Sequence, residues 1–196
     1  MLATPYPTPF SREGWLFEPK WDGYRAICFL HSGRVKFISR NNRDLTQRFP
    51  ELQVIAKSIK SDAAIIDGEI VALDEDGMPA FNDLRKTNRK TIVVYFAFDL
   101  LFENGEDLRE HELIKRKATL KNILPRTGRI RYTDHVLTDG WDLFRALKAQ
   151  QLEGMLAKKI DSIYVAGRSR NWLKIKTEFG REEQQRRSEA WDNRKR

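Results

Sequence analysis

Residues 18–25 read Glu18-Pro19-Lys20-Trp21-Asp22-Gly23-Tyr24-Arg25 and place a lysine between two strand-like segments. Asp-Gly is a common turn dipeptide, so one interpretation is a tight turn with an exposed lysine. The other is a lysine nucleophile on the rim of a pocket. A lysine must be neutral to attack phosphorus, and neighbouring cations favour its neutral form. On this stretch alone, both interpretations stay open.

The flanking sequence predicts a mixture of strands and helices without strict alternation, which favours an α+β fold with mainly antiparallel sheets. The turn Ser32-Gly33 predicts a β-hairpin, and residues 3–10, which are proline-rich, are expected to be extended. The other predicted strands cover residues 15–17, 24–31, 35–39, 64–73, 91–101, 154–159 and 172–176. The predicted helices cover residues 47–60, 81–86, 112–124 and 141–151.

Composition indicates a folded protein with a basic surface. The chain has 196 residues, 40% of them hydrophobic, which fits one large domain with or without a tail. Its net charge is +8, which favours polyanionic partners such as nucleic acid. The single cysteine, Cys28, lies in an apolar run and is expected to be buried and inert. We see no signal peptide and no membrane-spanning run, so we expect a cytoplasmic, nucleoid-associated protein with no membrane partner.

The last segment, residues 178–196, is charged and poor in apolar side chains. Glu182 with Arg186, and Glu183 with Arg187, have the i,i+4 spacing of ion pairs on a solvated helix. We therefore predict a charged helical tail after a domain that spans residues 1–177.

The pattern Lys20-x-Asp22-Gly23-x-Arg25 resembles motif I of the nucleotidyltransferases: DNA ligases, RNA ligases and mRNA capping enzymes. Stretches that resemble the later motifs follow in order: Ser39-Arg40, Ile66-Asp67-Gly68-Glu69, Tyr95 to Leu101, Glu153-Gly154 to Lys158, and Trp172 to Lys176. The resemblance runs from about residue 2 to 177. It is closest to the ligase domain of bacterial end-joining DNA ligases, which implies an ATP-grasp-like nucleotidyltransferase domain with antiparallel sheets flanked by helices.

The resemblance implies a role for each matching residue. Lys20 is the nucleophile that carries AMP, and Glu153 binds the divalent metal, Mg²⁺ or Mn²⁺, with Glu69 as a second candidate ligand. Phe98 covers adenine, and Glu18 lies near the adenine edge. The remaining candidate nucleotide-binding residues are Arg25, Arg40, Glu69, Lys158, Lys174 and Lys176.

Some of these residues also have plainer interpretations. Phe98 lies in an apolar strand, where core packing is the usual role of a phenylalanine, and Glu153-Gly154 fits a helix C-terminus. Lys174 and Lys176 share one face of a strand, where like charges repel unless an anion lies between them. A triphosphate is one such anion, and two solvated lysines are the alternative.

The implied reaction has three steps: Lys20 attacks the α-phosphate of ATP, AMP moves to the 5′-phosphate of nicked or broken double-stranded DNA, and the 3′-hydroxyl displaces AMP. A typical ligase continues into an OB domain, for which this sequence has no segment. We therefore expect slow self-adenylation and poor sealing by the chain alone, with a separate OB domain or end-joining proteins as partners. An RNA ligase or capping-type enzyme, and a non-catalytic nucleic-acid-binding module, are the alternatives.

Overall fold

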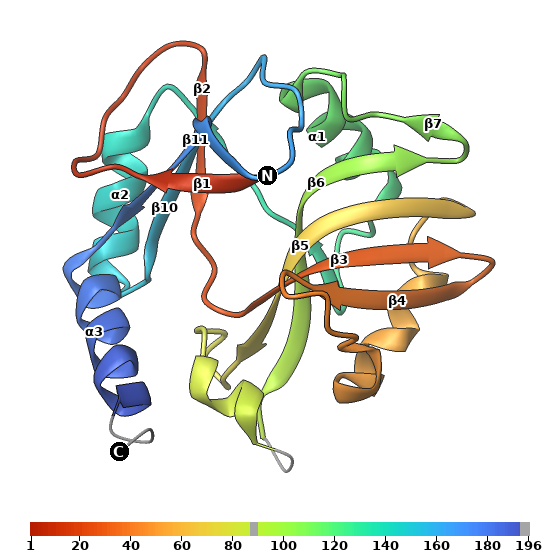
Figure 1. The fold of residues 1–196 in the computed structure, drawn as a ribbon, viewed down its shortest axis with the longest axis horizontal. Coiled ribbons are helices and arrows are strands. Elements are labelled where there is room, and N and C mark those ends of the chain that lie inside the picture. The colour runs from red at the N-terminus through yellow and green to blue at the C-terminus, as the bar shows by residue number, and fades with distance from the viewer. Residues whose placement is uncertain (87–89, 193–196) are drawn as a thin grey trace. The chain divides into compact units, whose positions relative to one another are not determined.

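The computed structural model describes residues 1–86 and 90–192, which form two compact units (Figure 1). Unit 1 contains Met1–Lys20, His135–Ile160 and the described residues from Ala166 onward. Unit 2 contains Trp21–Asp134 and Asp161–Val165. Each unit is built on one β-sheet with helices, so the predicted α+β class is confirmed.

Unit 1 has a five-stranded sheet in the order β1-β11-β10-β2-β9. Strand β1 runs parallel to β11, and the remaining neighbours are antiparallel. The strands are β1 (Leu2–Pro5), β2 (Trp15–Pro19), β9 (Val136–Leu137), β10 (Gly154–Lys159) and β11 (Arg168–Lys176), and the helices are α2 (Gly140–Ala149) and α3 (Glu178–Asp192).

The two faces of the unit 1 sheet differ in character because side chains alternate along each strand. One face is apolar and packs with α2 side chains such as Leu147. Its sheet residues are Trp15, Phe17, Met155, Ala157, Leu173 and Ile175. The cross-strand pairs Leu156↔Glu18, Leu156↔Lys174 and Gly154↔Lys176 occupy the opposite face. That face therefore carries the charged residues singled out in the sequence.

Unit 2 has a six-stranded sheet in which β4-β3-β5-β6-β7 are antiparallel neighbours and β8 pairs with β6 in parallel. Its strands are β3 (Tyr24–His31), β4 (Arg34–Ser39), β5 (Ala63–Leu73), β6 (Ile92–Glu103), β7 (Glu106–Asp107) and β8 (Ile130–Tyr132), and its α-helix is α1 (Leu113–Ile123). Short 3₁₀ helices cover Thr46–Arg48, Pro50–Lys57 and Phe81–Arg85.

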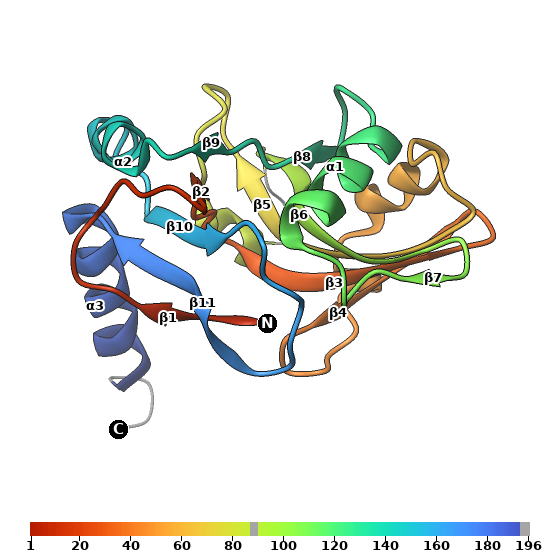
Figure 2. The same cartoon turned by 90° about the horizontal axis from the view of Figure 1, so that it is seen from above.

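The main core of unit 2 lies on one face of this sheet, under α1 and the 3₁₀ helix Pro50–Lys57 (Figure 2). Tyr95 is fully buried there, and its hydroxyl, which has one proton to donate, lies within hydrogen-bond distance of the carbonyl oxygens of Ala26 (2.9 Å) and Ile66 (2.8 Å). Gly68 leaves room for that ring, since a Cβ would lie 2.5 Å from it. Cys28 is fully buried in the same core, as predicted, and burial raises the pKa of its thiol.

The structure departs from the predicted elements mainly at residues 47–60. The expected helix is two 3₁₀ helices, Thr46–Arg48 and Pro50–Lys57, separated by Phe49. A residue before proline is held out of the α region, and Phe49 has φ −127° and ψ 62°. Part of the proline-rich segment is also a strand, β1, rather than only extended chain.

The charged C-terminal segment is helical in its described part. Helix α3 brings Glu182 to 3.8 Å from Arg186, and Glu183 to 3.8 Å from Arg187, so both i,i+4 pairs are confirmed. Residues 193–196 of the predicted tail lie outside the described residues, and the boundary at 177/178 stays a prediction. In the described part of the chain, no helix combines the length and apolar character needed to cross a membrane.

Candidate functional site

One carboxylate, that of Glu153, holds two lysines on the charged face of the unit 1 sheet. Lys20 Nζ lies 2.5 Å from Glu153 Oε2, and Lys176 Nζ lies 2.7 Å from Glu153 Oε1. The side chain of Lys20 is 23% exposed, that of Lys176 is 18% exposed and that of Glu153 is 10% exposed. The arrangement therefore presents a lysine nitrogen beside a base and a second cation, with access to solvent.

The backbone explains why Lys20 and Lys176 meet at Glu153. The amide of Lys20 donates to the carbonyl of Gly154 (2.9 Å), which extends the β2–β10 pairing by one residue. Gly154 also pairs with Lys176, so it lies between the two lysines. Its φ of +152°, and a Cβ that would lie 2.2 Å from the carbonyl oxygen of Ile175, exclude other residues. A residue without a side chain thus separates the two lysines.

Glu153 itself is fixed by the junction between β11 and α3. Thr177 donates its hydroxyl to the carbonyl of Leu152 (2.6 Å), and its amide donates to the carbonyl of Glu153 (3.1 Å). The amide of Gly180, in the first turn of α3, donates to the Thr177 hydroxyl (3.1 Å). Lys176 Nζ also donates to the Gly180 carbonyl (3.3 Å). The start of α3 is therefore part of the support of the Glu153 carboxylate.

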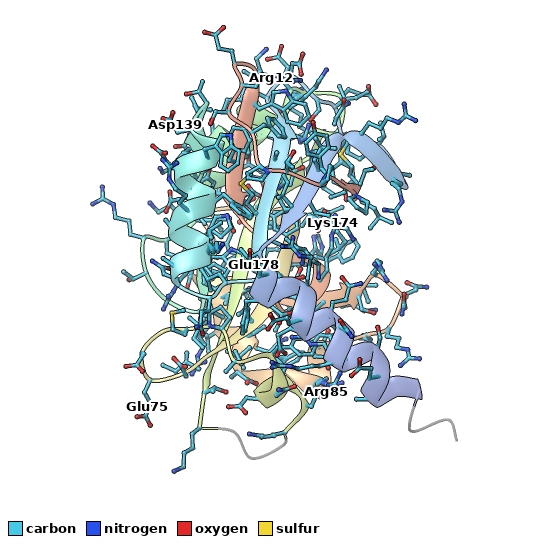
Figure 3. All side chains as sticks on the ribbon, turned by 90° about the vertical axis from the view of Figure 1, so that its left-hand side faces the viewer. Arg12, Glu75, Arg85, Asp139, Lys174 and Glu178 are labelled. Atoms are coloured by element: carbon cyan, nitrogen blue, oxygen red, sulfur yellow. The ribbon has the colours of Figure 1, made fainter. Side chains whose placement is uncertain are left out.

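Lys174, labelled in Figure 3 on the strand that leads to Glu178 and α3, adds a further cation to this face. Burial lowers the pKa of Lys174, and the positive charges of Lys20, Lys176 and Arg168 lower it further. Such a group of cations attracts an anion, because a bound anion relieves their mutual repulsion. The prediction that Lys174 and Lys176 share a face is confirmed.

Glu18 and Lys158 form a buried ion pair with each other on the same face. Both side chains are fully buried, and Lys158 Nζ lies 3.9 Å from the ring centroid of Trp172. A buried charge of this kind needs a close partner, so the pair joins β2 to β10 beside Lys20. The nucleotide-binding roles expected for Glu18 and Lys158 stay predictions.

In unit 2, Arg25 and Asp67 form a two-pronged ion pair. Arg25 Nε lies 3.0 Å from Asp67 Oδ1, and Arg25 Nη2 lies 2.6 Å from Asp67 Oδ2. Burial lowers the pKa of Arg25, but the Asp67 carboxylate more than reverses this, so the pKa lies above its ordinary value. Glu69 pairs with Arg25 across the strands and so lies on the same face of the sheet.

Phe98 and Arg40 are the other two predicted site residues in unit 2. The β5–β6 register shifts between Asp67 and Gly68, so Phe98 is an extra residue on β6. Such β-bulges redirect side chains, and the Arg25 guanidinium carbon lies 5.5 Å from the Phe98 ring centroid. Arg40 is exposed in the turn after β4. The predicted site residues are thus divided between the units, with Lys20, Glu18, Glu153, Lys158, Lys174 and Lys176 in unit 1 and Arg25, Arg40, Glu69 and Phe98 in unit 2.

Three residues that support the site, Asp67, Tyr164 and Thr177, were not among the predicted site residues. Asp67 stands in an apolar strand next to Ile66, and a carboxylate in such a place is costly to bury without a partner. That signal was present in the sequence, but it does not say which cation is the partner. Tyr164 and Thr177 carry no comparable local signal.

The residues of unit 1 fit a metal that is shared with a phosphate ligand. Among the described residues, no three His, Cys, Asp or Glu side chains gather into a metal site. Mg²⁺, however, is commonly held by one or two carboxylates together with substrate phosphates and water. Glu153 can supply one carboxylate beside the cationic face, and Glu69 as a metal ligand stays a prediction.

Comparison with known protein families identifies the family of this chain. The family model "ATP dependent DNA ligase domain" matches residues 1–176. The chain belongs to this ligase family. It is 35% identical over 178 residues to the "Multifunctional non-homologous end joining protein LigD" of Mycolicibacterium smegmatis, which covers 90% of this chain and 23% of that protein. The protein of the same name from Pseudomonas aeruginosa is 34% identical, covering 87% of this chain and 21% of its own length.

Solved structures of the ligase family have the same fold. "Mycobacterial DNA ligase D complexed with ATP and MES" superposes with a TM-score of 0.79 at 33% identity, covering 89% of this chain and 58% of the other. The ligase domain of Mycobacterium tuberculosis LigD gives a TM-score of 0.73 at 33% identity, covering 89% and 59%. The predicted resemblance to end-joining ligase domains is confirmed. The chain spans less than a quarter of the length of these two LigD relatives.

Proposed function

We propose that this ligase domain forms a covalent lysyl-AMP at Lys20 from ATP and passes the AMP to the 5′-phosphate of nicked DNA. The observation that carries the proposal is the contact of Lys20 Nζ with Glu153 Oε2 at 2.5 Å, with Lys176 on the other carboxylate oxygen. The family to which the chain belongs uses ATP. The mycobacterial DNA ligase D structure named above is described as a complex with ATP.

In the first step, a bond forms between Lys20 Nζ and the α-phosphorus, and the bond from that phosphorus to the bridging oxygen of pyrophosphate breaks. Glu153, whose carboxylate contacts Lys20 Nζ, accepts the proton that Lys20 loses in this step. Lys174 and Lys176 stabilise the negative charge that develops on the phosphate oxygens. Their positive charges are already in place, so they do not have to reorient during the reaction. Glu153 would hold the divalent metal, which would supply charge neutralisation at the phosphate oxygens.

In the later steps, the AMP phosphorus is transferred from Lys20 nitrogen to a 5′-phosphate oxygen of DNA, and Lys20 is released. The 3′-hydroxyl oxygen then attacks the 5′-phosphate, and AMP leaves. The net charge of +8 supports a DNA partner. Relatives named for non-homologous end joining support DNA repair as the context, with end-joining proteins or a separate OB domain as partners. A cytoplasmic, nucleoid-associated location is part of the same proposal.

The first experiment is intact mass before and after incubation with ATP and Mg²⁺. Wild-type protein is expected to gain the mass of one AMP, and Lys20→Ala is expected to gain none. Lys159→Ala is the matched control. Lys159 is also a lysine of the unit 1 sheet, at the end of β10, but its side chain lies on the face opposite to the charged one. Modification of Lys20→Ala to the same extent as wild type would overturn the assignment of the nucleophile.

The same assay separates the alternative functions. Incubation with GTP instead of ATP tests the capping-type reaction, which would add one GMP. Nicked duplexes whose 3′-OH strand is DNA or RNA separate DNA from RNA ligation. Binding of DNA by wild type and Lys20→Ala alike, with no covalent nucleotide on either, would favour a non-catalytic binding module.

A further inference from the structure

The segment Asp161–Val165, which joins β10 to β11, is fastened within unit 2 by its backbone. The amide of Tyr164 donates to the carbonyl of Arg109 (2.7 Å). The carbonyl of Ser162 accepts from the amide of Leu113 (3.0 Å) and from Arg116 Nη1 (3.0 Å). The position of this segment therefore does not depend on the hydroxyl of Tyr164.

That hydroxyl has a specific partner. Tyr164 donates to Asp67 Oδ2 at 2.8 Å, on the same oxygen that accepts from Arg25 Nη2 at 2.6 Å. Asp67 is fully buried, so its two oxygens depend on protein donors instead of water. Burial and then the charge of Asp67 raise the pKa of Tyr164. The phenol therefore stays protonated and remains a donor at working pH.

The Asp67 carboxylate in turn sets the orientation of Arg25. Two parallel contacts, 3.0 and 2.6 Å long, fix the plane of the guanidinium. The same guanidinium stands 5.5 Å from the Phe98 ring centroid, and the Arg25 side chain remains 22% exposed. A guanidinium held in this way binds a ligand at lower entropic cost than one that rotates freely.

We propose that Tyr164 is a positioning residue for nucleotide binding, which acts through Asp67 to hold the guanidinium of Arg25 beside Phe98. The inference rests on the proposed function and on the nucleotide contacts that the resemblance to DNA ligases predicts for Arg25 and Phe98. Tyr164 does not touch the nucleotide in this assignment. Its hydroxyl is the third donor to Asp67, and its removal lets the carboxylate and the guanidinium turn together.

The alternative is that Tyr164 only holds its own segment in place. Tyr164→Phe separates the two roles, because it keeps the ring over which the Arg116 guanidinium carbon lies at 5.9 Å. It also keeps the backbone bonds of the segment. Tyr6→Phe is the matched control, since Tyr6 is a half-exposed tyrosine in unit 1.

The test is a double-mutant cycle of Tyr164→Phe with Arg25→Lys, which keeps the charge of Arg25 but cannot form the two-pronged contact. The rate of Lys20 adenylation is measured against ATP concentration. We expect Tyr164→Phe to raise the half-saturating ATP concentration on the order of fivefold to tenfold, the scale of losing one ordinary intramolecular hydrogen bond, because Tyr164 acts on the ligand only through Asp67. The maximal rate should change less than about twofold, because binding is the affected step.

In the Arg25→Lys background, the same substitution is expected to change half-saturation less than about twofold, because the geometry that Tyr164 holds is already lost. Equal effects in both backgrounds, no effect in wild type, or a change confined to the maximal rate would each overturn the inference. Tyr6→Phe should behave as wild type. The cycle is also run on the Kd of ATP by calorimetry, which needs no covalent step.

The calorimetric arm separates this inference from the proposed function. If wild type binds ATP but gains no AMP, the proposed reaction fails, while coupling between Tyr164 and Arg25 in the Kd supports the inference. If wild type gains AMP and the cycle shows no coupling, the inference alone fails. If wild type neither binds ATP nor gains AMP, both fail.

Discussion

Glu153 is the counter-ion of both Lys20 and Lys176, so one carboxylate sets the charge balance around the proposed nucleophile. In the proposed reaction, the oxygen that contacts Lys20 Nζ also accepts the proton that this lysine loses. A ligand that competes for this carboxylate, such as a cation bound to ATP, changes the environment of both lysines at once. In the proposed reaction, Glu153 therefore both balances the charge of the two lysines and affects the reactivity of Lys20.

Glu153→Gln is expected to slow the adenylation of Lys20 by about 10²-fold, the scale of losing one group that stabilises charge in a transition state. The substitution keeps the shape of the side chain but removes its charge and its ability to accept the proton. The measurement is the initial rate of AMP incorporation at saturating ATP. Glu189→Gln, at an exposed position in α3, is the control, and a wild-type rate for Glu153→Gln would contradict the prediction.

Lys174 predicts a pH dependence of ATP binding. Its pKa is lowered, first by burial and then by neighbouring cations, so it loses its proton at a lower pH than an ordinary lysine. ATP affinity should therefore fall as the pH rises through this lowered pKa. In Lys174→Arg the fall should move to higher pH, because a guanidinium keeps its charge. Calorimetric titration with ATP, roughly from pH 7 to 10, measures the shift.

The free energy of unfolding of the ATP-free protein should change with pH in the opposite direction to the ATP affinity. Between the lowered pKa and the ordinary one, the unfolded chain binds more protons at Lys174 than the folded chain does. This group therefore adds stability as the pH rises through that window. Lys159→Arg is the control for both measurements, and identical pH profiles for wild type and Lys174→Arg would refute the assignment.

At the scale of elements, the first turn of α3 is more than the start of a solvated helix. Gly180 lies against Glu153, and a Cβ on Gly180 would lie 2.0 Å from the carbonyl oxygen of Glu153. The side chains farther along α3 are half-buried or exposed up to residue 190. The helix therefore contributes to the site only through its first turn.

Gly180→Ala should reverse the usual effect of this substitution in a helix. Alanine normally stabilises a helix interior by about 0.5–1 kcal/mol relative to glycine. Here the added methyl group has no room, so we expect a loss of about 1–3 kcal/mol and slower adenylation, since Glu153 must shift. Ser188→Ala, at an exposed position of α3, should instead be neutral or slightly stabilising. Thermal unfolding compares the two, and a stabilised Gly180→Ala would contradict the packing at Glu153.

Local patterns predicted most of the elements, because alternation and turn dipeptides act over a few residues. The hairpin at Ser32-Gly33 is an example, with positive φ at both residues. The helix predicted over residues 47–60 was wrong. Its hydrophobic spacing fits a helix, but Pro50 keeps Phe49 out of the helical conformation and divides the segment. The division into two units was not predicted, because strands β2 and β10 pair across more than a hundred residues of sequence.

The candidate site was predicted residue by residue, but its internal contacts were not. The motif order pointed to Lys20 and Glu153, which lie 133 residues apart in sequence and 2.5 Å apart in space. The sequence could not show that Glu18 and Lys158 pair with each other, since each was a charged residue on a strand with several candidate partners. The same holds for Arg25 and Asp67. Which charges pair is a property of tertiary packing.

At the scale of the whole molecule, the chain has 36 basic and 28 acidic residues, and this basic surplus favours binding to the DNA phosphates. Cations that contact phosphates release counter-ions, so DNA affinity falls as salt rises. For about four phosphate contacts, we expect affinity for nicked duplex to fall by about 10²-fold between roughly 50 and 200 mM salt. Fluorescence anisotropy measures this, and Lys20→Ala should show a similar slope. Salt-independent binding would contradict an electrostatic DNA interface.

The burial of Cys28 has a practical consequence for spectroscopy. The chain contains one cysteine, it is fully enclosed in the core of unit 2, and its raised pKa keeps it from forming the thiolate that reacts with maleimides. A cysteine introduced at exposed Ser188 or Lys57 is therefore labelled selectively in the native protein, with Cys28 left in place. A donor and an acceptor dye at these two positions, one in each unit, would report by energy transfer whether ATP or nicked DNA changes the distance between the two labelled residues.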